Sequence, residues 1–162
     1  MRSSNWSTTR NRSFEVINRL SGKTLATAES LTGGGIGAAL TAVSGSSAVY
    51  KGGIISYTDE IKRNILGVSA DSLVQYGAVS APVAGEMVSG VRRLMDSDVG
   101  VSVTGLAGPG GDEFGNEVGT VFIGYEDAGH HLVLRYHFEG NRDQVRAQTI
   151  EAALDLILQH NA

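Results

Sequence analysis

Apolar residues along the chain recur at two spacings, one typical of helices and one typical of strands. Ser13–Leu20 has apolar positions about one helical turn apart, which predicts a first helix that Gly22 ends. Residues 1–12 are mostly polar, with no apolar segment, and are expected to form a flexible N-terminal tail ahead of a single domain, 13–162. Further helical patterns cover residues 36–43, a short stretch ending near Gly67, and residues 69–76, 81–95 and 142–159.

Short apolar runs predict five strands, at residues 25–28, 52–57, 99–104, 118–125 and 131–138. Asp127-Ala128-Gly129 separates the last two and is typical of a hairpin turn. Thr58, Ser80 and Asn141 each precede a helical pattern and are expected to cap it. Strands interleaved with helices, followed by a hairpin, indicate an α/β fold: a three-layer α/β/α sandwich on a mixed sheet of about five strands.

In such sheets ligands bind beyond the carboxyl ends of the strands, where this chain has Ser30, Tyr57 and Thr104. Ser30 comes just before Thr32 and three glycines that open a helix. The first amides of a helix lack partners within it, and glycine lets a ligand approach them. A hydroxyl placed there can attack a carbonyl whose oxygen points at those amides. The alternative is that Ser30 or Thr32 merely caps the helix.

Lys62 lies one turn into the helix that follows Thr58, close to Tyr57 in the sequence. The helix N-terminus and burial in a crevice both lower the pKa of a lysine. A partly neutral Lys62 can take a proton from a serine, directly or through the Tyr57 phenol. The alternatives are a solvated lysine paired with Asp59 and a tyrosine packed on the core.

Composition narrows the classes of function. The 162 residues carry a formal charge of −4 and include no cysteine. Thiol catalysis, disulfides and cysteine-ligated zinc are therefore excluded, and a cytoplasmic location is expected. The charge gives no general attraction to nucleic acid or to anionic membranes, and no apolar run has the length of a membrane span. The 22 glycines, about twice the ordinary share, favour surfaces lined by backbone, as small-ligand sites use.

Other candidate motifs are either incomplete or explained by a structural role alone. The Gly105–Gly111 loop lacks the lysine of a P-loop, and Gly35-Ile36-Gly37 lacks the third glycine of a dinucleotide fingerprint. Arg142 and Arg146 lie one helical turn apart and can grip a phosphate, but neighbouring acids favour a solvated ion-pair face. The four histidines have no metal-site spacing and are expected at the surface: His130, His131, His137 and His160.

Several segments in the same order resemble the CinA C-terminal domain family, whose stand-alone members include nicotinamide-nucleotide amidohydrolases of the PncC type. The segments are TAESLTGGGIGAALTAVSGSSAVYKGGIISYTDEIKRNILGV, YGAVS, VSVTGLAGPGG and VGTVFIGY. The resemblance runs from about residue 14 to residue 158. It implies an α/β/α domain that hydrolyses the carboxamide of nicotinamide mononucleotide to nicotinate mononucleotide and ammonia. It also implies a serine nucleophile assisted by lysine and tyrosine, with no metal and no cofactor.

By matching motif, the resemblance implies that the catalytic residues are Ser30, Tyr57 and Lys62. The residues expected to contact the substrate are Glu29, Thr32, Gly33, Gly34, Ser47, Thr104 and Gly105. Glu29 would sense the positively charged nicotinamide ring, or would simply be a solvated carboxylate.

Two departures limit what the resemblance implies. Family members often carry Lys-Pro where this chain has Asn116-Glu117, which puts substrate contacts from that loop in doubt. Longer relatives have an N-terminal domain, and no activity of that domain is expected here. One alternative function is a non-catalytic nucleotide- or partner-binding module linked to competence or DNA damage. Another is an amidase for a different pyridine or nucleoside carboxamide. Edge-strand and helix surfaces make a homo-oligomer plausible.

Overall fold

A five-stranded mixed sheet forms the centre of the computed structural model, which describes residues 2–162 and their side chains from Thr8 onward. The strands are β1 (Leu25–Glu29), β2 (Tyr50–Ile55), β3 (Val99–Gly105), β4 (Thr120–Asp127) and β5 (His130–His137), in the order β2-β1-β3-β4-β5. The strand β1 pairs in parallel with both β2 and β3, whereas β4 and β5 are antiparallel to their neighbours. The carboxyl ends of β1, β2 and β3 therefore meet at one edge of the sheet.

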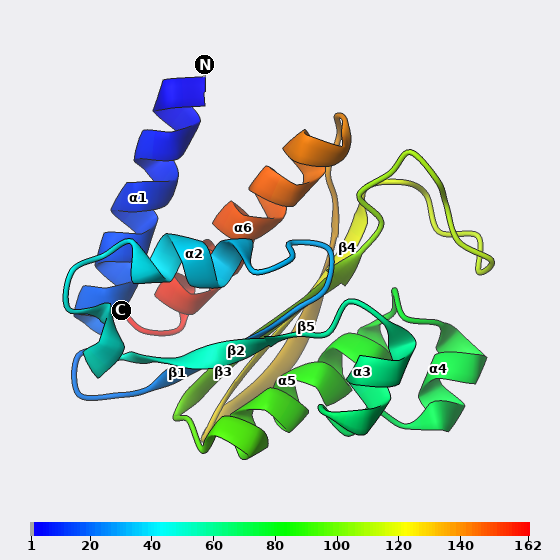
Figure 1. Cartoon of the computed structure of the whole chain (residues 1–162), viewed down its shortest axis with the longest axis horizontal. Coiled ribbons are helices and arrows are strands. Elements are labelled where there is room, and N and C mark those ends of the chain that lie inside the picture. The colour runs from blue at the N-terminus through cyan, green and yellow to red at the C-terminus, as the bar shows by residue number, and fades with distance from the viewer. Residues whose placement is uncertain (1) are drawn as a thin grey trace.

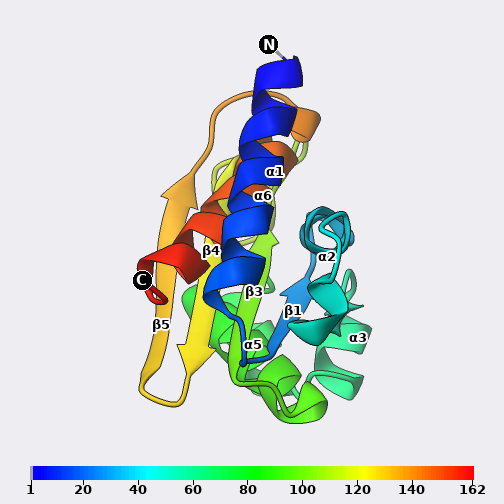
Figure 2. The ribbon, with the colours of Figure 1, turned by 90° about the vertical axis from the view of Figure 1, so that its left-hand side faces the viewer.

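Helices cover both faces of this sheet (Figures 1 and 2). They are α1 (Arg2–Arg19), α2 (Gly35–Thr41), α3 (Asp59–Asn64), α4 (Ala70–Tyr76), α5 (Ala81–Met95) and α6 (Arg142–Gln159), with a 3₁₀ turn η1 (Ser46–Ala48). The helices α1, α2 and α6 pack together on one face, and α5 crosses the other face with α3 and α4 beside it. The molecule is thus a three-layer α/β/α sandwich, as the sequence predicts.

Two apolar cores hold the layers together. Between the sheet and α6 lies a large core that includes Val101, Ile123 and Leu154. On the other face a smaller core joins Ala28 of β1 to Met87 of α5. Central strands β1 and β3 are almost fully buried, which explains why apolar and small residues predominate in their sequences. Within the described residues, no helix combines the length and apolar character that crossing a membrane requires.

The predicted elements and caps agree with the structure. Each observed strand matches a predicted segment to within two residues at either end. The side-chain oxygens of Thr58, Ser80 and Asn141 accept hydrogen bonds from the first turns of α3, α5 and α6. Asn141 also forms a capping box with Gln144. Local sequence signals therefore set most of the boundaries.

The N-terminal segment differs from the prediction, because α1 runs continuously over Arg2–Arg19. The expected flexible tail is wrong for residues 2–12, while Met1 lies outside the described residues. Arg12 donates to Glu151 at 3.4 Å and to Asp155 at 2.6 Å, both on α6. Arg12 is therefore held by polar contacts between helices, and apolar spacing does not reveal a helix of this kind.

Candidate active site

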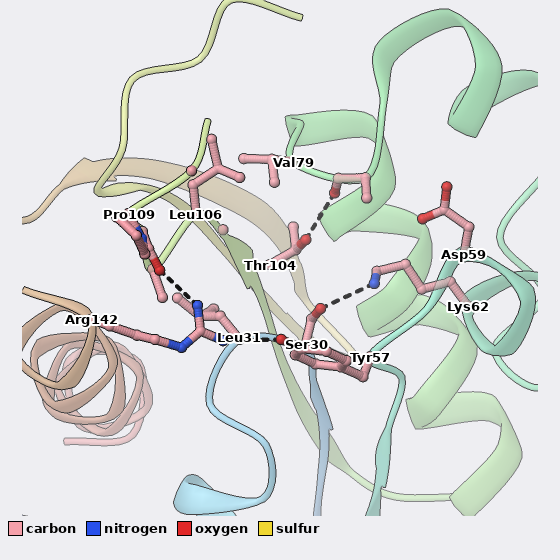
Figure 3. A pocket seen from close by; sticks show the side chains of 15 residues that line it. Ser30, Leu31, Tyr57, Asp59, Lys62, Val79, Thr104, Leu106, Pro109 and Arg142 are labelled. Atoms are coloured by element: carbon pink, nitrogen blue, oxygen red, sulfur yellow. Dashed lines mark hydrogen bonds between the residues drawn. The ribbon is translucent and has the colours of Figure 1, made fainter. Parts of the chain in front are cut away.

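A cavity of about 500 Å³ opens at the carboxyl ends of β1, β2 and β3. Ser30 directly follows β1, Tyr57 follows β2, and Thr104 and Gly105 end β3. Figure 3 shows the side chains of Ser30, Tyr57 and Thr104 near those of Lys62 and Arg142, which come from α3 and α6. The cavity is lined by Ser30, Leu31, Tyr57, Asp59, Lys62, Ala78, Val79, residues 104–110 and Arg142. The topology thus brings together the three residues that the resemblance marks as catalytic.

Ser30 and Lys62 form a buried pair in this cavity. Lys62 is 1% exposed and donates from Nζ to the Ser30 Oγ at 3.0 Å (Figure 3). Burial lowers the pKa of Lys62 to about 8, although the negative charge of Asp59 acts in the opposite direction. The predicted direction of the shift is therefore confirmed, and burial is its main cause. A lysine of this kind exchanges a proton with its hydroxyl partner near neutral pH.

Ser56, at the end of β2, positions Lys62 and is a residue that the sequence reasoning missed. Its carbonyl oxygen accepts a second hydrogen bond from the Lys62 Nζ at 2.7 Å. Its amide and hydroxyl donate to the Glu29 carbonyl oxygen at 2.7 and 3.3 Å. These contacts join β1, which leads into Ser30, to Lys62 of α3. The only sequence signal was a serine near the end of the predicted strand 52–57, and such a serine is not a specific signal.

Glu29 is a buried helix cap, so the expectation of a solvated carboxylate is wrong, and Glu29 is not among the residues that line the cavity. It is 2% exposed, and its carboxylate accepts hydrogen bonds from the Thr32 hydroxyl at 2.5 Å and from three backbone amides that open α2. The amides belong to Gly34 at 3.2 Å, Ile36 at 3.0 Å and Gly37 at 2.9 Å. A carboxylate at a helix N-terminus is favourable electrostatically. It occupies the amides that were expected to face the substrate.

The glycine turn after Ser30 therefore lies behind the cavity wall. Thr32, Gly33 and Gly34 are not among the residues that line the cavity. The Gly33 amide donates to the Ser30 carbonyl oxygen, which closes the turn. Glycine is needed at positions 33 and 34 because φ is 59° and 101° there. The role of these glycines in the structure is to shape the turn that presents Ser30.

Of the other expected substrate contacts, the cavity includes two and leaves one outside. Thr104 and Gly105 line it, but the Thr104 hydroxyl donates its hydrogen to the Ala78 carbonyl oxygen at 2.8 Å. The proton of Thr104 is therefore already engaged. Ser47 is exposed in η1 and does not line the cavity. Ser47 lies outside the site, although it is close in the sequence to the turn that follows Ser30.

Tyr57 and Arg142 meet at the rim of the cavity. Arg142 donates from Nη2 to the Tyr57 hydroxyl at 3.0 Å and from Nη1 to the Gly108 carbonyl oxygen at 2.8 Å. Among the described residues, no hydrogen bond joins Tyr57 to Ser30 or Lys62, and no carboxylate pairs with Arg142. The expected ion-pair face is wrong here, because the first turn of α6 abuts the β3–β4 loop (Figure 3). Arg142 instead brings an unneutralised positive charge to the cavity.

The β3–β4 loop is tied to the cavity wall at the position where this chain departs from the resemblance. Asn116 donates to the Val79 carbonyl oxygen at 3.2 Å and to the Asp112 carboxylate at 2.7 Å. Asn116 therefore supports the loop and is not among the lining residues. In the part of the chain that the structure describes, no three metal-ligating side chains come together.

A family model for the CinA C-terminal domain matches residues 9–160. The chain belongs to the CinA C-terminal domain family. A CinA-like protein of Synechococcus sp. (strain RCC307) is 48% identical over 137 residues, which cover 83% of this chain and 33% of that protein. A CinA-like protein of Thermotoga neapolitana is 42% identical over 149 residues, which cover 90% and 36%. The chain thus spans about a third of the length of these curated relatives.

Solved structures of the CinA superfamily have the same fold over nearly their whole length. A superfamily protein from Klebsiella pneumoniae 700603 superposes with a TM-score of 0.91 at 35% identity, covering 93% of this chain and 96% of that chain. One from Escherichia coli gives a TM-score of 0.92 at 37% identity, covering 94% and 90%. A competence/damage-inducible protein from Agrobacterium tumefaciens gives 0.89 at 34% identity, covering 96% of each. The matched region therefore covers at least 90% of this chain and of each of these solved structures.

Proposed function

We propose that this chain is a nicotinamide mononucleotide amidohydrolase that uses Ser30 as its nucleophile. The observation that carries the proposal is the buried contact between the Ser30 Oγ and the Lys62 Nζ at 3.0 Å. A serine with a lysine base is an established arrangement for acyl transfer. Membership of the CinA C-terminal domain family supports the choice of a carboxamide nucleotide as substrate.

In the first step Lys62 acts as the base. With a pKa of about 8, Lys62 is neutral in roughly a tenth of molecules at pH 7. The neutral amine takes the proton of Ser30, and the Ser30 Oγ attacks the carboxamide carbon. The tetrahedral intermediate then collapses as the C–N bond breaks. Lys62 returns the proton to the leaving nitrogen, which departs as ammonia and leaves an ester on Ser30.

Water completes the reaction through the same two residues. Lys62 accepts a proton from a water molecule that attacks the ester carbon. The C–O bond to Ser30 then breaks, and the Ser30 Oγ recovers the proton from Lys62. The balance is one water consumed and one ammonia released, with nicotinate mononucleotide as the other product. The carbonyl oxygen of Ser56 keeps the Lys62 Nζ in place through both steps.

The oxyanion needs hydrogen-bond donors other than the α2 amides, because Glu29 already occupies those of Gly34, Ile36 and Gly37. We place these donors in the backbone of the cavity wall, at Leu31 or in the loop that follows Gly105. Amides held in such a wall stabilise the negative charge without reorganisation.

Arg142 is our choice for the substrate phosphate. Its guanidinium is held by two neutral acceptors, Gly108 and Tyr57, and retains its full charge at the cavity rim. A planar guanidinium binds phosphate oxygens in a bidentate manner. In this scheme Tyr57 orients Arg142. It does not relay a proton, as the sequence had suggested for Tyr57.

The test is release of ammonia and nicotinate mononucleotide by the purified protein. Lys62→Met should lower turnover at least about 100-fold, as expected on removing a general base. Lys51→Met, at an exposed lysine of β2, is the matched control and should leave turnover unchanged. Nicotinamide riboside, which lacks the phosphate, should react more slowly than the mononucleotide.

Two results would contradict the proposal. If the wild type binds nicotinamide mononucleotide without turnover, the cavity belongs to a binding module. If the protein instead hydrolyses another pyridine or nucleoside carboxamide and leaves the mononucleotide intact, the substrate is wrong while the serine chemistry stands.

A further inference from the structure

Arg146 contacts the main chain immediately after the nucleophile. It lies one helical turn beyond Arg142 on α6 and is half-buried. Its Nε donates to the Leu31 carbonyl oxygen at 2.9 Å, and its Nη2 donates to the Thr32 carbonyl oxygen at 3.3 Å. The expected ion-pair face is therefore wrong for Arg146 as well. Both acceptors are uncharged carbonyl oxygens, and both belong to the turn that carries Ser30.

Other hydrogen bonds hold the remaining parts of this turn. The Ser30 amide donates to the Val103 carbonyl oxygen at 3.1 Å, and the Glu29 carboxylate holds the amides that open α2. Among the described residues, Arg146 is the only partner of the Leu31 carbonyl oxygen. Gly33 and Gly34 give the turn its shape but no side chains to fix it. The Ser30 and Thr32 carbonyl oxygens also accept hydrogen bonds from the Gly33 and Gly35 amides, so the Leu31 carbonyl oxygen is the one held by α6 alone.

We infer that Arg146 is a positioning residue for the nucleophile, an inference that rests on the proposed function. The Ser30 Oγ must stay within hydrogen-bond reach of the Lys62 Nζ and in line with the carboxamide carbon. Arg146 holds the two residues that follow Ser30 and so limits movement of the Ser30 Oγ away from Lys62. It does not line the cavity, so it acts on the reaction only through Ser30.

The two arginines of α6 then have separate effects on the reaction. Arg142 reaches the substrate cavity, whereas Arg146 reaches the turn behind it. Loss of Arg142 should raise KM, because a phosphate contact is lost. Loss of Arg146 should lower kcat and leave KM within about twofold, because a displacement of about 1 Å at a nucleophile costs about 100-fold in rate.

The experiment compares Arg146→Ala, Arg146→Lys and the control Arg135→Ala, an exposed arginine on β5. Two readouts are measured: kcat and KM for nicotinamide mononucleotide, and the rate at which a small sulfonyl fluoride modifies Ser30. Arg146→Ala should lower kcat and the modification rate in parallel, by about 100-fold. Arg146→Lys can restore one of the two hydrogen bonds and should be intermediate. Millimolar guanidinium should partly rescue Arg146→Ala, and Arg135→Ala should match the wild type.

A sulfonyl fluoride rate for Arg146→Ala equal to that of the wild type would overturn the inference. So would a fall in kcat no larger than the loss of folded protein measured by circular dichroism. The sulfonyl fluoride rate also separates this inference from the proposed function, because it reports on Ser30 whatever the natural substrate is. If the wild type fails to hydrolyse nicotinamide mononucleotide, slower modification in Arg146→Ala still supports the positioning role.

Discussion

Lys62 is almost fully buried, and the proposed reaction depends on the environment of its amine. Desolvation makes the charged form unfavourable, while Ser30 and Ser56 supply oxygen partners for the amine. In the proposed mechanism the fold therefore holds a base whose pKa is near the pH at which it acts. Asp59 opposes part of this shift from the cavity rim, so it provides a way to test the pKa.

Asp59→Asn should move the pH dependence of kcat/KM to lower pH. Neutral Lys62 is the active form, so the rate should rise with pH and level off above a pKa of about 8. Removing the negative charge of Asp59 makes the ammonium less stable and lowers the pKa of Lys62 further. The measurement is the pH–rate profile of both proteins, with the exposed neighbour Glu60→Gln as control. A profile that stays in place, or moves to higher pH, would contradict this assignment.

At the scale of residues, the sequence singled out Ser30 and Lys62, which the structure brings into contact, but not the residues that hold them. Ser30 and Lys62 stand in motifs that the family resemblance identifies, and local signals placed each near a strand end or helix start. Ser56 and Arg146 act through backbone carbonyls, and such contacts leave no pattern in side-chain type. Arg146 reaches Leu31 across 115 positions of sequence, a pairing that only the packing of α6 defines. Glu29 was misread because its carboxylate folds back onto the following helix.

At the scale of elements, α5 shows how tightly a helix is fitted to the segment that follows α3. A Cβ on Gly90 would overlap the carbonyl oxygen of Leu66, whereas a Cβ on Gly85 would come within 3.2 Å of the His131 ring. The first neighbour is backbone, which is hard to displace. The second is a side chain at the surface, which can turn away.

Gly90→Ala and Gly85→Ala should therefore have different effects on stability, although both lie in one helix. Both substitutions gain about 1 kcal/mol of helix propensity. The overlap at Gly90 should nevertheless lower the free energy of unfolding by at least about 2 kcal/mol, since overpacking against backbone forces α5 away from Leu66. Gly85→Ala should stay within about 1 kcal/mol of the wild type. Urea denaturation measures both, and equal stabilities for the two variants would show that the contact at Gly90 is not tight.

The order and type of the elements were predictable because caps and apolar spacing are local properties. Thr58, Ser80 and Asn141 each accept a hydrogen bond from the turn that they precede. Residues 8–12 of α1 were not predicted as helix, because the contacts that the structure shows for them are polar. Arg12 pairs with Glu151 and Asp155 of α6, and the Thr9 hydroxyl donates to Glu151. Pairing order in the sheet also depends on long-range contacts that periodicity does not encode.

At the scale of the whole molecule, the two ends of the sheet serve different purposes. One end carries the cavity, and the other carries a polar cluster that ties the β4–β5 hairpin to the end of the chain. Asp127 accepts hydrogen bonds from the Tyr125 hydroxyl at 2.6 Å and from the Gly129 amide at 2.9 Å, and it pairs with His130. Asn161 donates to the same hydroxyl, and His160 stacks on the Tyr125 ring. This cluster fastens α6, which in turn carries both arginines of the site.

Asp127→Asn should weaken the fold at neutral pH and matter less in acid. Hydrogen bonds from Tyr125 and His130 outweigh the opposing effect of burial and lower the pKa of Asp127 to about 2. A lowered carboxyl pKa contributes stability that is complete above the unfolded value of 3.8 and is lost as pH falls through about 2. The difference in unfolding free energy should be about 2 kcal/mol at pH 7 and should shrink below pH 4. A difference that is constant from pH 7 to pH 2, measured by urea denaturation, would contradict this.

The most direct test of the account is turnover and binding of nicotinamide mononucleotide by Ser30→Ala, with the exposed Ser44→Ala as a matched control. Ammonia release is measured by a coupled assay and binding by calorimetry on the same preparations. We expect Ser30→Ala to bind within a few-fold of the wild type and to lose at least about 1,000-fold in turnover, because no other group supplies the nucleophile. Ser44→Ala should match the wild type. Turnover that persists in Ser30→Ala would show that the cavity hydrolyses its substrate by another route and that the Ser30–Lys62 pair is not the catalytic centre.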